Sequence, residues 1–322
     1  MNILIIGLGV IGGTYGWQLA KNSGNQITHY IRNEKNILYR ENGISIKCLD
    51  MRKSKGEEIS EVYKPNVIID IAGITNDEYD LVIVPVKVNQ VDNIIELLKC
   101  VNKDIPVLFL QNLWITQINT IEKVFVGRTI IFGQPHLIGG GIIKNEIICT
   151  IFNNKNAPTM LGSHNNKKNA IMMELSDTLS RSQLNPQIVN NIVPWLITHY
   201  VESAGLIAGV MKAKNEKKYV ETTKYINDSV LLTREGYKVC SKYGINSYFV
   251  YPQCLYWAPL PLIASALQKM FSSKESQLMI QGHIMHSPDE MKYMFGEVLK
   301  AGILKNVKMT KYLEYASFVE AY

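Results

Sequence analysis

Short runs of apolar, mostly β-branched residues recur along the first half of the chain, separated by helical patterns and polar loops. The run from Asn2 to Ile6 predicts a buried strand, and helical spacing follows it up to Ala20. Further strands are predicted at 27–31, 44–49, 67–71, 80–84, 105–110, 128–133, 145–152 and 158–162, the last two antiparallel at a sheet edge. A helix is predicted over 88–101. Strands that alternate with helices are typical of an α/β domain with a parallel sheet.

The pattern changes in the second half, where the strand signal fades and helical periodicity takes over. Helices are predicted at 168–182, 187–212, 217–244, 256–271 and 286–302. The polar stretch from Ser163 to Asn169 separates the two patterns and is typical of a domain boundary. We therefore expect an α/β domain over residues 1–165 and an all-α domain over residues 166–322.

Composition is that of an ordinary globular protein, with 47% hydrophobic and 19% charged residues. The net charge of +6 comes from short, scattered lysine clusters, which indicates solvated surfaces rather than a nucleic-acid interface. Five widely spaced cysteines without a C-x-x-C pair predict reduced thiols in a cytoplasmic protein, and neither a disulfide framework nor a metal site. No stretch reaches the ~18 apolar residues of a membrane span.

The most informative motif is the G-x-G-x-x-G spacing of Gly7, Gly9 and Gly12, directly after the first strand. The first glycine permits a tight turn, the second lets the backbone approach a pyrophosphate, and the third allows close helix–strand packing. Free N–H groups at the start of the helix then face the phosphates. This context predicts a Rossmann-type dinucleotide-binding domain. The expected cofactor-binding segment consists of Gly7, Leu8, Gly9, Val10, Ile11 and Gly12.

The residue that follows the second strand favours NADP over NAD. A site that prefers NAD carries an acidic residue there to bind the ribose 2′-hydroxyl. This chain has Arg32, followed by Asn33 and Lys35. A guanidinium can bind a 2′-phosphate through two parallel hydrogen bonds.

Lys87 and Asn112 each follow a predicted strand, so both are expected just beyond its carboxyl end. In an open α/β sheet the ligand lies at that edge. Their shared position makes them candidate residues for contact with cofactor and substrate.

A polar group interrupts the mostly apolar segment around 187–212. Trp195, His199, Glu202 and Ser203 fall at helical steps on one face. Buried polar groups need partners, so the cluster is either a satisfied core network or a set of groups that face a cleft. The pattern leaves both interpretations open.

Five features of this chain occur together: the N-terminal glycine motif, Arg32, Lys87 after VIVPV, LQN ending at Asn112, and the helical second half. In this combination the chain resembles the ketopantoate reductase (2-dehydropantoate 2-reductase) family. The resemblance implies an NADPH-binding Rossmann-type domain, an all-helical domain, and a substrate site between them. It implies that the glycines hold the pyrophosphate and Arg32 the 2′-phosphate. Lys87 would lie beside the cofactor, and Asn112 would contact cofactor and substrate.

The second half departs from this family. Members carry a catalytic lysine in the second long helix of the helical domain, whereas Trp195 to Ser203 contains none. The family's serine-led stretch ending in a glutamate has only loose counterparts here, at Ser272 to Glu275 and Pro288 to Glu290. The candidate proton donor is then either Lys87 or His199, which has Glu202 beside it. A histidine suits this role because the side chain exchanges protons near neutral pH.

These observations predict an NADPH-dependent reductase of a small 2-keto acid or related carbonyl compound, a substrate that carries a carboxylate. A homodimer is compatible with this function. The alternative is an NADP-binding regulator or sensor that keeps the fold without efficient turnover. A third hypothesis is a reductase of a larger substrate, which Trp114 and the aromatic-rich segment 243–257 could accommodate.

Overall fold

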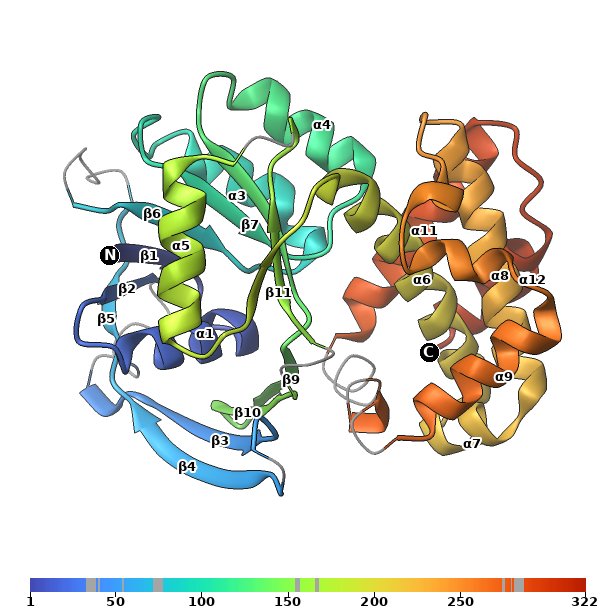
Figure 1. Cartoon of the computed structure of the whole chain (residues 1–322), viewed down its shortest axis with the longest axis horizontal. Coiled ribbons are helices and arrows are strands. Elements are labelled where there is room, and N and C mark those ends of the chain that lie inside the picture. The colour runs from blue at the N-terminus through green and yellow to red at the C-terminus, as the bar shows by residue number, and fades with distance from the viewer. Residues whose placement is uncertain are drawn as a thin grey trace. The chain divides into compact units, whose positions relative to one another are not determined.

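The computed structural model describes residues 1–32, 39, 41–53, 55–71, 78–153, 157–165, 168–273, 276–278, 280 and 287–322. Asn33, Lys35, Lys274 and Glu275 lie outside the described residues. The chain divides into two compact units, Met1–Val193 and Pro194–Tyr322. Figure 1 follows the elements of each unit along the chain.

The first unit is built on an eight-stranded sheet in the order β12-β11-β8-β7-β6-β1-β2-β5. Its strands are β1 (Asn2–Ile6), β2 (Gln26–Tyr30), β5 (Asn66–Ile68), β6 (Leu81–Val84), β7 (Val107–Leu110), β8 (Ile130–Pro135), β11 (Thr159–Gly162) and β12 (Pro186–Ile188). All pairs from β8 to β5 are parallel, and β11 joins β8 in the antiparallel direction. The central strands β6 and β7 are fully buried, as their continuous apolar sequences predict.

Helices connect these parallel strands. The helices of this unit are α1 (Val10–Ala20), α3 (Val91–Leu98), α4 (Ile115–Val124) and α5 (Ala170–Arg181), with the short 3₁₀ helix η2 (Val88–Gln90) before α3. In Figure 1, α5 crosses in front of the sheet, with α3 and α4 behind it. The result is a Rossmann-type α/β domain.

A second sheet, in the order β4-β3-β10-β9, packs on α1. Its strands are β3 (Ile44–Asp50), β4 (Glu57–Tyr63), β9 (Ile138–Ile143) and β10 (Glu146–Ile151). Gly13 of α1 lies against Ile147 of β10, where a larger residue would clash. The helix that follows the glycine motif is therefore enclosed between two sheets.

The regular elements among the described residues of the second unit are all helices. It contains α6 (Ile192–Ala213, which begins two residues before the division), α7 (Glu216–Glu221), α8 (Thr223–Ser241), η3 (Ser247–Phe249), η4 (Gln253–Trp257), α9 (Leu260–Phe271), α11 (Pro288–Leu304) and α12 (Thr310–Glu320). Helix α8 packs against α9, α11 and α12. Its apolar face, with Ile226, Val230 and Tyr237, is fully buried in this core.

The division lies later than the boundary that the sequence predicts after residue 165. Residues 166–193 belong to the first unit, because β12 pairs with β11 at the edge of the large sheet. Helix α5 packs on β12. The division thus lies beyond the polar stretch around residue 165, and the chain enters the second unit inside α6.

Other elements also differ from the predicted pattern. The strand predicted over 145–152 pairs with β3 and β9 of the second sheet, and only the 158–162 strand lies antiparallel in the large sheet. The helix predicted over 217–244 is interrupted at Thr222, which separates α7 from α8. Helix α12 was not predicted, although its buried Tyr312, Tyr315 and Val319 have helical spacing. Among the described residues, no helix is both long and apolar enough to span a membrane.

Candidate active site

The predicted site residues of the first unit all follow strands that end at one edge of the large sheet. Strands β1, β2, β6 and β7 are parallel neighbours, so their carboxyl ends meet at this edge. In the sheet, the chain continues from β1 to β2 on one side and from β6 to β7 on the other side. The order of the strands therefore reverses between β1 and β6, which makes this the switch point of the fold. Open α/β sheets bind ligands at such a point.

The glycine loop between β1 and α1 shows why each glycine is required. Gly7 has φ of +96°, a conformation that favours glycine. Gly9 is exposed, and a Cβ atom there would meet nothing within 4 Å, so the backbone is open to a ligand. Gly12 is buried, and its Cβ would lie 2.9 Å from the carbonyl oxygen of Gly7 and 3.0 Å from Pro85 Cγ. The third glycine therefore lets the helix lie against the loop.

Helix α1 presents its first N–H groups at this loop. The first backbone hydrogen bond of the helix is donated by Gly13 N to Gly9 O at 2.7 Å. The N–H groups of Val10, Ile11 and Gly12 precede it, so they have no acceptor within the helix. The first turn holds no acidic side chain. Val10 and Ile11 are partly exposed, whereas Leu8 is buried. The positive end of the helix is thus available to an anion, and the loop fits the pyrophosphate of a dinucleotide.

Arg32 is exposed and follows the strand β2. The loop and this strand are tied together, because Gly7 N donates a hydrogen bond to Tyr30 O at 2.8 Å. The backbone thereby brings Arg32 to the same edge as the glycine loop, two residues beyond the tied strand end.

Two glutamines hold the segment that carries Lys87. Gln111 Oε1 accepts a hydrogen bond from Val86 N at 3.0 Å, and Gln117 Nε2 donates one to Val88 O at 3.0 Å. The two neighbours of Lys87, Val86 and Val88, are therefore each held through a backbone atom by a glutamine side chain, one from the end of β7 and one from α4. Lys87 itself is half-buried.

Asn112 directly follows Gln111, so the same hydrogen bond joins its loop to the Lys87 segment. Asn112 is half-buried, and its Oδ1 atom is buried without a hydrogen-bond partner among the described residues. A buried acceptor without a donor costs free energy unless a ligand or water supplies one. Asn112 can thus accept a hydrogen bond from a bound molecule.

In the second unit, α6 brings the polar cluster together as its helical spacing predicts. The rings of Trp195 and His199 stack with centroids 4.9 Å apart. Ser203 Oγ lies 3.4 Å from His199 Nε2, and Glu202 Oε2 lies 3.8 Å from His199 Nδ1. The side chains of His199 and Glu202 are 17% and 21% exposed. The cluster is therefore a hydrogen-bonded network that remains partly open to solvent.

Glu202 is held from a distant part of the sequence. Tyr256 OH donates a hydrogen bond to Glu202 Oε1 at 2.9 Å, and Gln253 Nε2 lies 3.5 Å from Oε2. Burial, and then the nearby Glu202 carboxylate, raises the pKa of Tyr256 well above its usual value, so its hydroxyl stays protonated and donates. These two partners come from η4, and helical spacing within α6 gave no signal for them.

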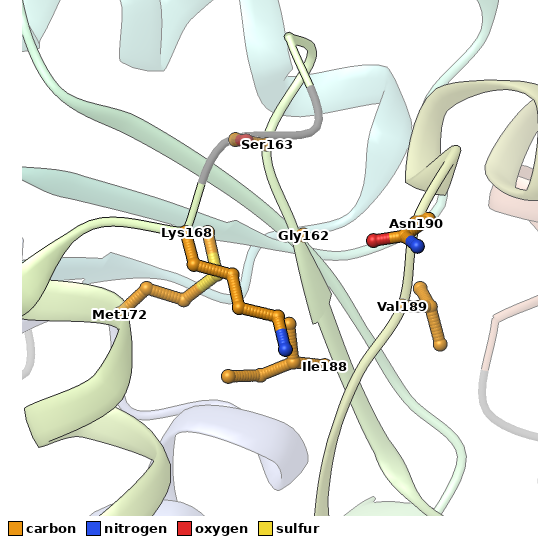
Figure 2. A pocket seen from close by; sticks show the side chains of 7 residues that line it. All are labelled: Gly162, Ser163, Lys168, Met172, Ile188, Val189 and Asn190. Carbon is orange, nitrogen blue, oxygen red and sulfur yellow. The ribbon is translucent and has the colours of Figure 1, made fainter.

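Two further observations concern the remaining hypotheses. Trp114 is the N-cap residue of α4 and is 1% exposed, so its side chain lies in the core. It therefore lines no surface site within the described residues. Figure 2 shows the side chains around a shallow surface depression at the end of β11, and none of the predicted site residues is among them. Its lining residues are Gly162, Ser163, Lys168, Met172, Ile188, Val189 and Asn190.

Comparison with known proteins gives a family match over half of the chain. Residues 3–165 match the model of the family described as ketopantoate reductase PanE/ApbA. A 2-dehydropantoate 2-reductase from Pyrococcus horikoshii is 22% identical over 315 residues, which cover 96% of this chain and 93% of that protein.

Solved structures share the fold over the whole chain. D-mandelate dehydrogenase with NADH and anilino(oxo)acetate has a TM-score of 0.73 at 20% identity, and the match covers 100% of this chain and 98% of that one. A dimeric ketopantoate reductase from Staphylococcus aureus has a TM-score of 0.67 at 16% identity, with the same coverage of both chains.

Proposed function

The chain belongs to the ketopantoate reductase PanE/ApbA family of oxidoreductases, and we propose that it reduces a small 2-keto acid or a related carbonyl compound with NADPH. The observation that carries this proposal is the convergence of the glycine loop, Arg32, Lys87 and Asn112 at one sheet edge. A purely structural domain has no need for a loop that is open at Gly9.

The residues of the glycine loop fit a nicotinamide dinucleotide. The N–H groups at the start of α1 would hold its pyrophosphate, and Arg32 would bind the 2′-phosphate that distinguishes NADP from NAD. When bound, the reduced cofactor supplies the hydride. The absence of an acidic residue in the first turn of α1 supports the binding of an anion at this loop.

We assign Lys87 and Asn112 to the reacting end of the site. The Lys87 ammonium would attract the carboxylate or carbonyl oxygen of the substrate, and the Asn112 amide would orient cofactor and substrate. The two glutamine hydrogen bonds that fix the Lys87 segment support this assignment, because positioning groups need rigid backbone.

Reduction also requires a proton for the developing alkoxide, and this chain lacks lysine from Trp195 to Ser203. We assign proton delivery to His199, whose imidazole is partly exposed. Glu202, fixed by Tyr256, would hold the imidazole in place. The Lys87 ammonium is the alternative donor.

The chemistry of the relatives supports this substrate class. One relative is named for the reduction of 2-dehydropantoate, and one solved neighbour is a D-mandelate dehydrogenase. Both compounds belong to couples of a 2-keto acid and a 2-hydroxy acid. The mandelate dehydrogenase was solved with NADH, so the preference for NADPH rests on Arg32 alone.

Partly exposed ionisable groups at His199 and Glu202 favour an enzyme over a sensor without turnover. The proposal includes a cytoplasmic location, consistent with five free cysteines, and assembly into a homodimer, as in the Staphylococcus aureus neighbour. The experiment that tests the function is NADPH oxidation with a panel of 2-keto acids that includes ketopantoate.

A further inference from the structure

A buried histidine, His29, contacts the glycine loop. His29 lies in β2 and is 0% exposed. Its Nδ1 atom lies 2.9 Å from the carbonyl oxygen of Gly7, the first glycine of the motif. On the other side of the ring, Nε2 lies 3.1 Å from the hydroxyl of Tyr63 in β4. The ring thus links the loop to the second sheet.

The partners of His29 determine where its proton lies. Burial lowers the pKa of His29 to about 4, so the ring is neutral near pH 7. A carbonyl oxygen can only accept a hydrogen bond, so Nδ1 carries the hydrogen and donates it to Gly7 O. Nε2 is then an acceptor, and the Tyr63 hydroxyl donates to it. Burial raises the pKa of Tyr63, which keeps that hydroxyl protonated.

The surrounding residues leave space for this ring. Gly16 of α1 faces His29, and any side chain at that position would clash with the imidazole. The Tyr63 ring meets the imidazole edge to face, with centroids 5.7 Å apart. The histidine is therefore held on several sides and cannot change its direction freely.

Fixing the Gly7 carbonyl also fixes the next N–H group. The peptide between Gly7 and Leu8 is planar and trans, so its N–H points away from its carbonyl. The carbonyl points inward to His29, and Leu8 N–H consequently points to the opposite side. Gly7 has φ of +96°, and a glycine at this position can rotate more freely than any other residue.

We propose that His29 is a positioning residue for dinucleotide binding, which orients the Gly7–Leu8 peptide so that its N–H faces the pyrophosphate. This role rests on the proposed binding of a dinucleotide at the glycine loop. His29 touches no ligand itself. It acts through the carbonyl of Gly7.

Two substitutions distinguish the contributions of the two ring nitrogens of His29. The amide nitrogen of Asn reaches the position of Nδ1, so His29→Asn keeps a donor for Gly7 O. The longer side chain in His29→Gln places its amide near Nε2, facing Tyr63, and leaves Gly7 O without its donor. The dissociation constants of the full chain are measured for NADPH and for adenosine 2′-phosphate, which carries no pyrophosphate. Thermal melting checks that each variant is folded.

His29→Gln is expected to weaken NADPH binding about 5- to 10-fold, the effect of one lost hydrogen bond. His29→Asn should remain within about twofold of the unaltered protein. Adenosine 2′-phosphate should bind all three proteins alike, because it does not contact the loop. Equal NADPH affinity in His29→Gln, or an equal loss for both nucleotides, would overturn the role of His29.

A measurement on the unaltered protein remains informative if His29→Gln does not fold. NADPH should slow hydrogen exchange at the Leu8 amide, and unchanged exchange would contradict the proposed orientation. The two proposals fail differently. An unaltered protein that binds neither NADPH nor NADH contradicts both the function and the role of His29, whereas tight NADPH binding that is insensitive to His29→Gln contradicts only the latter.

Discussion

Gln111 Oε1 accepts a hydrogen bond from the backbone N–H of Val86 at 3.0 Å, and this contact joins the ends of β6 and β7. Each partner adjoins a candidate site residue, since Lys87 follows Val86 and Asn112 follows Gln111. The loops that carry Lys87 and Asn112 are therefore joined to each other at the sheet edge. A change in either loop is expected to act on the other.

Lys87→Ala and Asn112→Ala should each reduce turnover of the substrate strongly while they change stability little. Neither side chain is fully buried, and substitutions at such positions usually stay within about 0.5 kcal/mol. Steady-state kinetics and thermal melting measure the two effects. Lys103→Ala, at an exposed position of the same unit, serves as the control. A large loss of stability with turnover intact would mark both residues as structural.

Arg32→Asp should reverse or narrow the preference for NADPH over NADH. The substitution replaces a cation with an anion where the 2′-phosphate is proposed to bind, so NADPH should bind at least about tenfold more weakly, or about 1.4 kcal/mol. Titration with both cofactors measures the change. Arg181→Asp alters the net charge equally at another exposed position and should leave the preference unchanged. Equal affinity for NADH and NADPH in the unaltered protein would refute the role of Arg32.

His199→Gln should remove most turnover if His199 delivers the proton, because general acid catalysis typically contributes about 10²–10⁴-fold. The side chain is partly exposed, so the fold should tolerate the change. His164→Gln makes the same substitution at a 58% exposed position and should leave turnover intact. If His199→Gln instead lowers stability by about 1–3 kcal/mol without loss of turnover, the cluster is a core network.

Stability should fall at mildly acidic pH because of His29. Its pKa is about 4 in the folded protein and about 6.5 in the unfolded chain, so only the unfolded state takes up a proton between these values. The stabilisation is complete above about pH 6.5 and is lost as the pH falls toward 4, at about 1.4 kcal/mol per pH unit. The neighbouring Tyr63 has a raised pKa and does not titrate in this range.

Urea unfolding of the unaltered protein and of His29→Asn at pH 7 and pH 5 tests this expectation. The other acid-sensitive groups are common to both proteins, so the difference between them isolates His29. The unaltered protein should lose about 2 kcal/mol more than the variant between these pH values. Parallel losses would show that His29 does not contribute.

Local patterns in the sequence predicted the elements nearest the glycine loop well. The strand from Asn2 to Ile6 and the helix after it depend on neighbouring residues, as does the helical face that carries His199 and Glu202. Pairing between distant strands does not depend on local pattern. Residues 146–151 form a strand as predicted, but they join Ile44–Asp50 in a second sheet, which no local signal indicates.

The same distinction applies to the candidate site. Motif spacing led to the glycines, Arg32, Lys87 and Asn112 as candidate residues, and their roles stay predictions. It could not identify His29 or Tyr256, because their roles arise from contacts with Gly7 and Glu202 across the fold. Tyr256 lies 54 residues from Glu202 in the sequence, and its hydroxyl reaches the carboxylate only once η4 is folded against the helices.

The proposed reduction is tested most directly by following NADPH oxidation with a panel of 2-keto acids, with NADH run in parallel. We expect at least one small 2-keto acid to be reduced to its 2-hydroxy acid with NADPH, and more slowly with NADH. Ketopantoate should not turn over at the rate of a dedicated ketopantoate reductase, because the chain has no lysine from Trp195 to Ser203 and proton delivery typically contributes about 10²–10⁴-fold. Tight binding of NADPH with no turnover across the panel would contradict the enzymatic function and favour a sensor. Rapid reduction of ketopantoate would contradict the assignment of proton delivery to His199.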